Sequence, residues 1–91
     1  MTRILVKGSE IAVPSSVGAA SSFSEATVVR LANASTTDYV ITVATDNGGS
    51  RTIGTFTMLA NTSEFVEKNP TDVVFVNSGS DVKGTKVGFT N

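Results

Sequence analysis

The chain has 91 residues and contains no cysteine, histidine or tryptophan. A chain of this length forms one domain with a modest hydrophobic core. Without cysteine it has no disulfide and no thiolate metal site, and without histidine it lacks the usual general base near neutral pH. Thirteen valines, thirteen threonines and eleven serines dominate the composition, which is more typical of a small β-rich domain than of an enzyme.

The residue types favour β-structure throughout the chain. Valine, isoleucine, threonine, phenylalanine and tyrosine account for 36 of the 91 residues, and such side chains fit the pleated surface of a sheet. No segment of ten or more residues places apolar side chains at helical spacing. We therefore expect an all-β fold, a small antiparallel β-sandwich or barrel of about seven short strands with an N-terminal arm.

The first segments of the chain are two apolar runs followed by a polar stretch. Residues 2–7 (TRILVK) are expected to form a strand that ends at Gly8. A second, shorter run at 11–13 stops at Pro14, because proline lacks the N–H that a strand interior needs.

The polar stretch at 14–25 is predicted to be a surface loop or arm. Its one large apolar side chain, Phe23, is expected either in the domain's own core, which we favour, or inserted into a partner. We assign residues 1–25 to an N-terminal strand and arm and residues 26–91 to the β-sandwich, within a single domain.

Regular alternation of apolar and polar residues begins after this arm. Strands are predicted at 27–33, 39–45 and 51–58. The last two are separated by DNGGS at 46–50, and Asn-Gly sequences accept the positive φ angles of tight hairpin turns. These two strands should therefore be antiparallel neighbours, and Gly54 should mark a bulge or a close packing approach.

Three more strands complete the predicted fold. Residues 64–68 form a short strand, and 72–77 (DVVFVN) is the most continuously apolar run. We expect 72–77 to be a central strand covered on both faces. Residues 82–90 close the chain, with Val87 and Phe89 on one face.

Catalytic chemistry is not indicated, and we predict no catalytic, cofactor-binding or metal-binding residues. Glu64 and Glu67 are three residues apart, which places their side chains on opposite faces of a strand. The segment at 46–48 (DNG) lacks the spacing of a calcium loop. No serine lies in a nucleophile elbow or has a histidine partner. We therefore expect the protein not to be an enzyme.

Nucleic-acid and membrane partners are not expected either. The formal net charge is −1 and the charged residues are scattered singly, so no basic stripe is available to follow a phosphate backbone. The six basic residues beyond Lys7 are assigned to solvated strand faces: Arg3, Arg30, Arg51, Lys68, Lys83 and Lys86. The apolar run near the start is too short for a signal peptide or a membrane span.

Association with other protein chains is the remaining expectation. The threonines of the predicted outer faces (Thr42, Thr55 and Thr57) offer flat, hydrogen-bonding surfaces, and strands 39–45 and 51–58 carry few charges to prevent lateral pairing. A small domain with a thin core gains stability from a partner. We therefore predict a homo-oligomer or a docked subunit.

About half of the chain, residues 22–70, resembles small virion structural proteins of tailed bacteriophages, particularly those that infect marine cyanobacteria. The shared elements are an S-x-A-T-V-V-R-L-x-N segment, an I-T-V-A strand, a G-T-F-T strand and an E-K-x-P-T-D turn, here at 24–33, 41–44, 54–57 and 67–72. The turn with Pro70 is the most distinctive of them.

This resemblance implies a non-enzymatic virion component. The role it favours is that of a decoration or cement protein on the capsid surface, made in the host cytoplasm and bridging major capsid protein subunits, commonly as a trimer. Residues 1–25 would then be the arm that holds neighbouring subunits. Two alternatives stay open: a neck, tail or fibre-associated virion protein, and a carbohydrate- or cell-surface-binding β-module.

Overall fold

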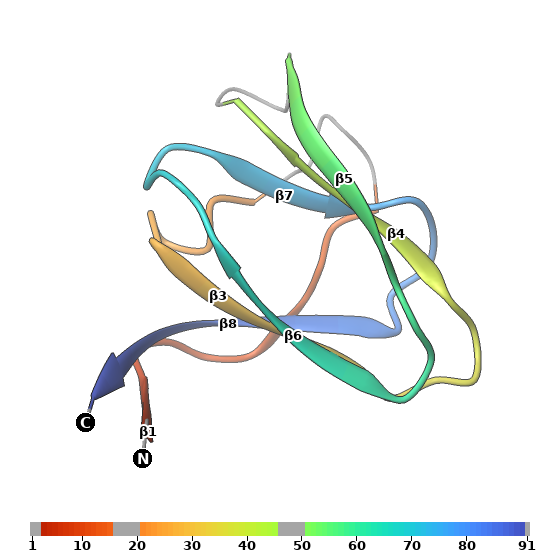
Figure 1. Cartoon of the computed structure of the whole chain (residues 1–91), viewed down its shortest axis with the longest axis horizontal. Helices are drawn as coiled ribbons and strands as arrows, with labels where there is room; N and C mark the ends of the chain where they lie inside the picture. Colours follow the sequence, from red (N-terminus) through yellow and green to blue (C-terminus); the bar gives the residue numbers. More distant parts are fainter. Residues whose placement is uncertain (1–2, 16–20, 46–50, 91) are drawn as a thin grey trace.

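The structure is a computed structural model that describes residues 3–15, 21–45 and 51–90. Within these residues the chain forms eight antiparallel strands in two sheets (Figure 1), which confirms the all-β prediction. The strands are β1 (Arg3–Val6), β2 (Ile11–Ala12), β3 (Val28–Asn33), β4 (Tyr39–Ala44), β5 (Thr52–Met58), β6 (Thr62–Glu67), β7 (Val73–Val76) and β8 (Val82–Thr90). The described part of the chain contains no helix with the length and apolar character that crossing a membrane would require.

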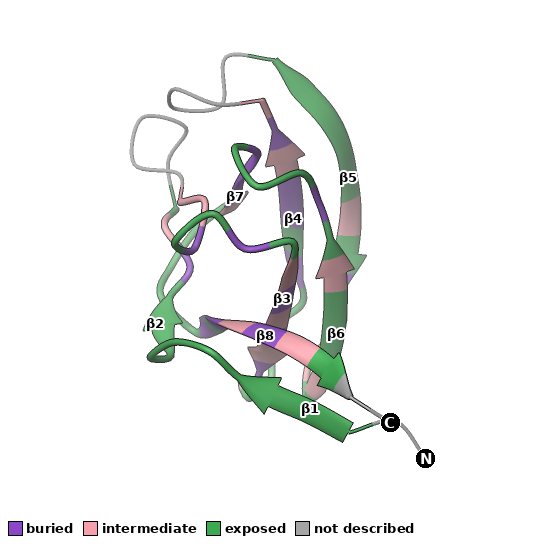
Figure 2. Ribbon diagram, turned by 90° about the vertical axis from the view of Figure 1, so that its left-hand side faces the viewer, coloured by how far each residue is buried: buried purple, intermediate pink, exposed green. Residues whose placement is uncertain are grey.

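The longest strand, β8, organises the first sheet. One edge of β8 pairs with β3, which pairs in turn with β6. The other edge pairs with β2 and, further along, with β1. Because the pairing of β8 with β3 ends at Lys86, the last residues of β8 and β1 form a two-stranded ribbon at one end of the molecule (Figure 2).

The second sheet has the order β5-β4-β7. The predicted antiparallel pairing of 39–45 with 51–58 is confirmed, since Tyr39 lies opposite Met58 and Val43 opposite Gly54. The register shifts after Val43, which is the bulge that Gly54 predicted. The predicted turn at 46–50 lies outside the described residues.

The hydrophobic core lies between the inner faces of the two sheets (Figure 2). It contains alternate residues of the strands, as period-two burial requires. Fully burying one such aliphatic side chain contributes about 1.5–3 kcal/mol. The core side chains from the strands are Val29, Leu31, Tyr39, Ile41, Met58, Val74, Val76 and Val82.

The arm is integrated into this core. Val13 and Phe23 are both buried in the cluster, so Phe23 lies in the domain's own core, as favoured from the sequence. The Val13 N–H donates to the Val82 carbonyl at 2.8 Å. An ideal Cβ atom built on Gly84 would lie 2.6 Å from Cε1 of Phe23, so the ring packs directly on the β8 backbone.

A left-handed turn positions Phe23. Residues Phe23, Ser24 and Glu25 have φ angles of 54°, 56° and 58°, a conformation that costs about 1–2 kcal/mol for each L-residue. Two lysines far along the chain hold the turn. Nζ of Lys86 donates to the Ser24 carbonyl at 3.0 Å, and Nζ of Lys68 donates to the Ala26 carbonyl at 2.7 Å.

The prediction that 72–77 is a central strand is wrong. β7 is the last strand of the second sheet, although Val73, Val74 and Val76 are buried. The arm covers its outer edge: the Val76 N–H donates to the Pro14 carbonyl at 2.9 Å, and Ser21 forms a bridge with Val74. This cover explains how an end strand can be as apolar as a central one.

Candidate interaction surfaces

The outer face of the first sheet carries a cluster of apolar side chains, which we call the apolar platform: Ile4, Val6, Phe65 and Phe89. The register places Ile4 opposite Phe89 and Val6 opposite Val87, and directly opposite residues share a face. Phe65 reaches this face because both it and Thr85 lie opposite Arg30. The face is the outer one, because Val29 and Leu31 on either side of Arg30 point into the core.

The platform is exposed although its centre is not. Phe65 and Phe89 are 48% and 47% exposed, whereas Val87 between them and β1 is only 3% exposed. The two rings meet edge to face, with centroids 5.0 Å apart and planes at 66°, an arrangement that stabilises the pair beyond its buried area. The platform is therefore a preformed surface rather than a set of scattered apolar residues.

A hollow of about 410 Å³ lies within this face. Ile4, Val6 and Val87 supply its apolar lining, and its polar lining includes Glu10 and Arg30. An apolar surface with a polar margin is the usual composition of a site that binds another protein.

The apolar platform was not predicted from the sequence. The signal is present in two places: the run ILV in 2–7 has no polar residue to give it an outer face, and Val87 and Phe89 share one face of the last strand. Bringing these residues together with Phe65 requires the pairing of β1, β8, β3 and β6, which no local pattern specifies.

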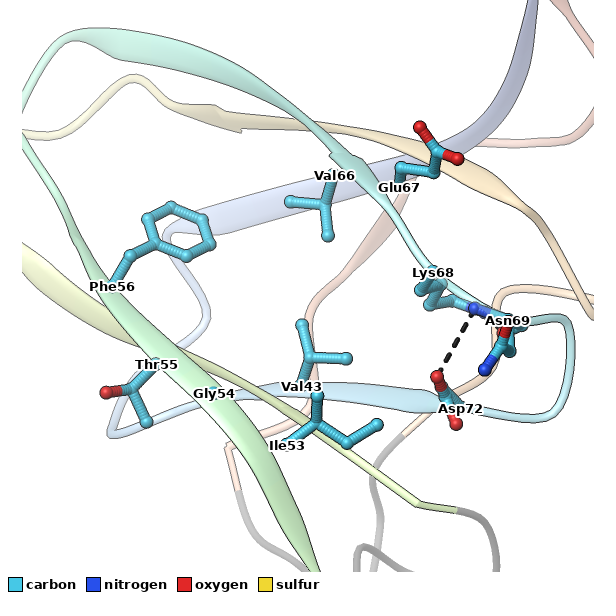
Figure 3. A pocket seen from close by; sticks show the side chains of 10 residues that line it. All are labelled: Val43, Ile53, Gly54, Thr55, Phe56, Val66, Glu67, Lys68, Asn69 and Asp72. Atoms are coloured by element: carbon cyan, nitrogen blue, oxygen red, sulfur yellow. Dashed lines mark hydrogen bonds between the residues drawn. The ribbon is translucent and has the colours of Figure 1, made fainter.

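A second concave site lies between β5 and β6, the end strands of the two sheets (Figure 3). Its volume is about 580 Å³. Val43, Phe56 and Val66 form an apolar wall. The polar lining includes Lys68 and Asn69, which follow β6, and Asp72, which precedes β7. The Asn69 N–H donates to Oδ2 of Asp72 at 3.2 Å (Figure 3).

Lys68, predicted on a solvated strand face, is instead buried, with 7% of its surface exposed. Its Nζ donates to the carbonyls of Ala26 at 2.7 Å, Asn69 at 3.3 Å and Pro70 at 3.4 Å. Burial lowers the pKa of this ammonium group, while the carboxylates of Asp72 and Glu25 oppose that change. All three N–H donors have acceptors. The ammonium group therefore holds three backbone carbonyls together by hydrogen bonds and is not free to act as a nucleophile.

Tyr39 is a core residue at the start of β4. Its hydroxyl donates to Oδ2 of Asp81 at 2.5 Å, and this hydrogen bond raises the pKa of the hydroxyl above its ordinary value. Both groups are thereby engaged in a contact between the start of β4 and the turn before β8.

The carboxylates are not gathered into one site. Glu64 and Glu67 lie opposite Leu31 and Val28, on opposite faces of β6 as predicted. Asp72 and Asp81 lie beyond the two ends of β7. Among the described residues no three carboxylates come together as a set that could hold a metal ion.

The threonine-bearing strands differ in their availability. Both edges of β4 are paired, with β5 and β7, so the expected lateral association through 39–45 is wrong. Thr42 is buried, while Thr55 and Thr57 are exposed on β5. Of these two strands, only β5 has an edge at the end of its sheet.

Comparison of the chain with protein families, with curated proteins and with solved structures found no match.

Proposed function

We propose that the chain is a non-enzymatic virion structural protein of a tailed bacteriophage, most simply a decoration or cement protein that docks on the head shell. Its partners are then major capsid protein subunits, and its place is the capsid surface. The proposal combines the resemblance of residues 22–70 to phage structural proteins with one structural observation, the apolar platform.

The platform supports a docking role because of its composition and place. Two exposed phenylalanines and two exposed aliphatic side chains gather on one face, and aromatic side chains are enriched at the centres of protein interfaces. Most of the platform is carried by the β1–β8 ribbon, which extends beyond β3, and its side chains lie on the face of the first sheet that is turned away from the core.

The test uses phage heads assembled without this chain. Purified protein is incubated with the heads, and the bound fraction is measured by co-sedimentation. We expect saturable binding that Phe65→Asp weakens at least tenfold, because a charge would be desolvated within the contact. Ile53→Asp is the matched control, since Ile53 is also an exposed apolar residue but lies on β5.

Two results would contradict the proposal. One is the absence of binding by the unmodified protein, and the other is equal binding by the Phe65 and Ile53 variants. If a virion map placed the chain at the neck, tail or fibre instead, the virion role would remain and the head-shell position would be wrong.

A carbohydrate-binding module is the second candidate, because the platform does expose two aromatic rings. Sugar rings stack on flat aromatic faces, whereas Phe65 and Phe89 cross at 66° and so present no common plane. Phenylalanine also lacks the polar group by which tyrosine and tryptophan add a hydrogen bond. Binding on a glycan array that is lost in the Phe65 variant would favour this candidate over head docking.

A further inference from the structure

We propose that β1 pairs antiparallel with β1 of a second copy of this chain, so that the protein forms a twofold dimer. The proposal rests on the sheet edges alone and goes beyond the docking function. An exposed strand edge is a template for another strand, and a self-complementary edge leads to a closed twofold pair.

Five of the described strands have an outer edge, and four of them are short or protected against such pairing. β2 is only two residues long. β5 carries a bulge opposite Val43, and β6 carries Glu64 and Glu67. The outer edge of β7 is covered by the arm at Pro14 and Ser21. Bulges, charges and covering segments are the devices by which natural proteins protect sheet edges.

The one such device in β1 is the charge of Arg3 at the start of the strand. All four of its residues are exposed, and Ile4, Leu5 and Val6 follow one another without a charge, a proline or a bulge. Its only partner strand among the described residues is β8. An apolar strand that is open on one edge and exposed on both faces can pair with a strand of another chain, and natural proteins usually prevent this.

The backbone of β1 fixes how a second copy would pair. The Lys7 N–H donates to the Lys86 carbonyl at 2.9 Å, so by alternation Leu5 bonds to β8 while Ile4 and Val6 direct their N–H and C=O groups to the open edge. A twofold axis through Leu5 places Ile4 of each copy opposite Val6 of the other. This register makes four main-chain hydrogen bonds and packs Leu5 against Leu5 of the second copy.

The same register sets the strength of the dimer. It buries on the order of 400 Å² per copy, below the size of a stable interface and within the range of weak, transient ones. It also brings Arg3 opposite Lys7 of the second copy, and opposed like charges weaken a strand pair. We therefore expect a weak dimer that exchanges with the monomer and forms only at high protein concentration.

The axis is perpendicular to the sheet, so the outer faces of both copies lie on the same side. The two apolar platforms would then adjoin across β1 and form one larger surface. A docked dimer would bind a repeating partner at two points, which increases affinity without any new contact.

Sedimentation velocity over a range of concentrations tests the dimer on the purified chain alone. We expect a monomer–dimer equilibrium that Leu5→Lys weakens at least tenfold, because two lysines would oppose each other on the axis. Val6→Pro should do the same by removing an outward N–H that β8 does not use. Leu59→Lys is the matched control, since Leu59 is 57% exposed and Leu5 is 51% exposed, and it should dimerise normally.

A monomer at millimolar concentration would overturn the proposal, as would a trimer, which the phage resemblance favours. Equal weakening by Leu5→Lys and Leu59→Lys would place the contact elsewhere. Because no phage head is present in this experiment, its failure is distinct from a failure of the docking function.

Discussion

The ring of Phe23 occupies the space that a side chain on Gly84 would need. An ideal Cβ atom at Gly84 would lie 2.6 Å from Cε1 and 2.7 Å from Cζ of the ring, closer than van der Waals contact allows. The left-handed turn at 23–25 and the glycine at position 84 of β8 are thus two parts of one packing arrangement. In it, the Phe23 ring of the arm packs into the core against the first sheet.

Gly84→Ala is therefore expected to destabilise the protein. The methyl group forces the ring or the strand to move, and overpacking of this kind typically costs about 1–3 kcal/mol. Urea unfolding measures the change. Gly54→Ala is the control, because a Cβ atom there meets no atom within 4 Å, and its stability should stay within about 0.5 kcal/mol of the unmodified protein. Equal stability of the two variants would contradict the packing of Phe23 on β8.

Asn33 connects two turns from a buried position. Its Nδ2 donates to the Thr37 carbonyl at 2.8 Å and to the Leu59 carbonyl at 3.4 Å, while its Oδ1 accepts from the Ser35 N–H at 3.1 Å. Asn33→Asp replaces the donor by a carboxylate oxygen that faces two carbonyls. The expected loss at neutral pH is more than about 2 kcal/mol, because one oxygen of a buried carboxylate would face two carbonyl oxygens and no donor.

Acidification should restore part of that loss. Repulsion by the carbonyls raises the folded-state pKa of the introduced carboxyl above its unfolded value, so the variant is most stable at low pH and loses stability as pH rises. The control is Asn77→Asp, since Oδ1 of Asn77 accepts from the Val40 N–H at 3.0 Å and a carboxylate preserves that bond. A variant at Asn33 with pH-independent stability relative to the unmodified protein would count against these contacts.

The Tyr39–Asp81 hydrogen bond predicts a pH dependence in the alkaline range. The folded-state pKa of Tyr39 is raised above the ordinary value of 10.0, first by this hydrogen bond. Its stabilising contribution is therefore complete below pH 10 and is lost as pH rises through the folded-state pKa. Tyr39 is the single tyrosine and there is no tryptophan, so tyrosinate absorbance reports this group directly. Asp81→Asn should lower the observed pKa, and an unchanged titration would exclude the bond.

Lys68 provides a fourth test. Lys68→Met keeps the aliphatic side chain but leaves the carbonyls of Ala26, Asn69 and Pro70 without their donor. Loss of a charged donor to buried carbonyls should cost about 1–3 kcal/mol. The same substitution at Lys83, which is exposed, should change stability by less than about 0.5 kcal/mol. Chemical denaturation compares the two, and equal effects would show that the hydrogen bonds of Lys68 do not stabilise the fold.

The sequence predicted the strands well because their alternation is a local property. The expected strand at 27–33 is β3 (Val28–Asn33), and the expected strand at 82–90 is β8 (Val82–Thr90). Tight turns and β-branched residues determine where such strands begin and end. Strand order was not predictable, because it depends on pairings between distant segments.

Two differences follow from that limit. The apolar run at 72–77 indicated burial correctly but not its source, since an arm segment and a neighbouring strand cover an edge equally well. Lys68 carries the usual signal of a surface residue, and its burial depends on carbonyls that the turn at 23–25 and Pro70 bring together. The apolar platform, likewise, exists only after four strands have paired.

The central position of β8 has a consequence for synthesis. β1, β2 and β3 all pair with β8, although β8 is made after every other described strand. A ribosome therefore releases an apolar β1 that has neither of its edges covered until β8 emerges. The hairpin of β4 and β5 can form earlier, because its two strands are close in sequence. The interval between these events is the period in which nascent chains are most exposed to mutual aggregation, and slow translation across 68–82 would lengthen it.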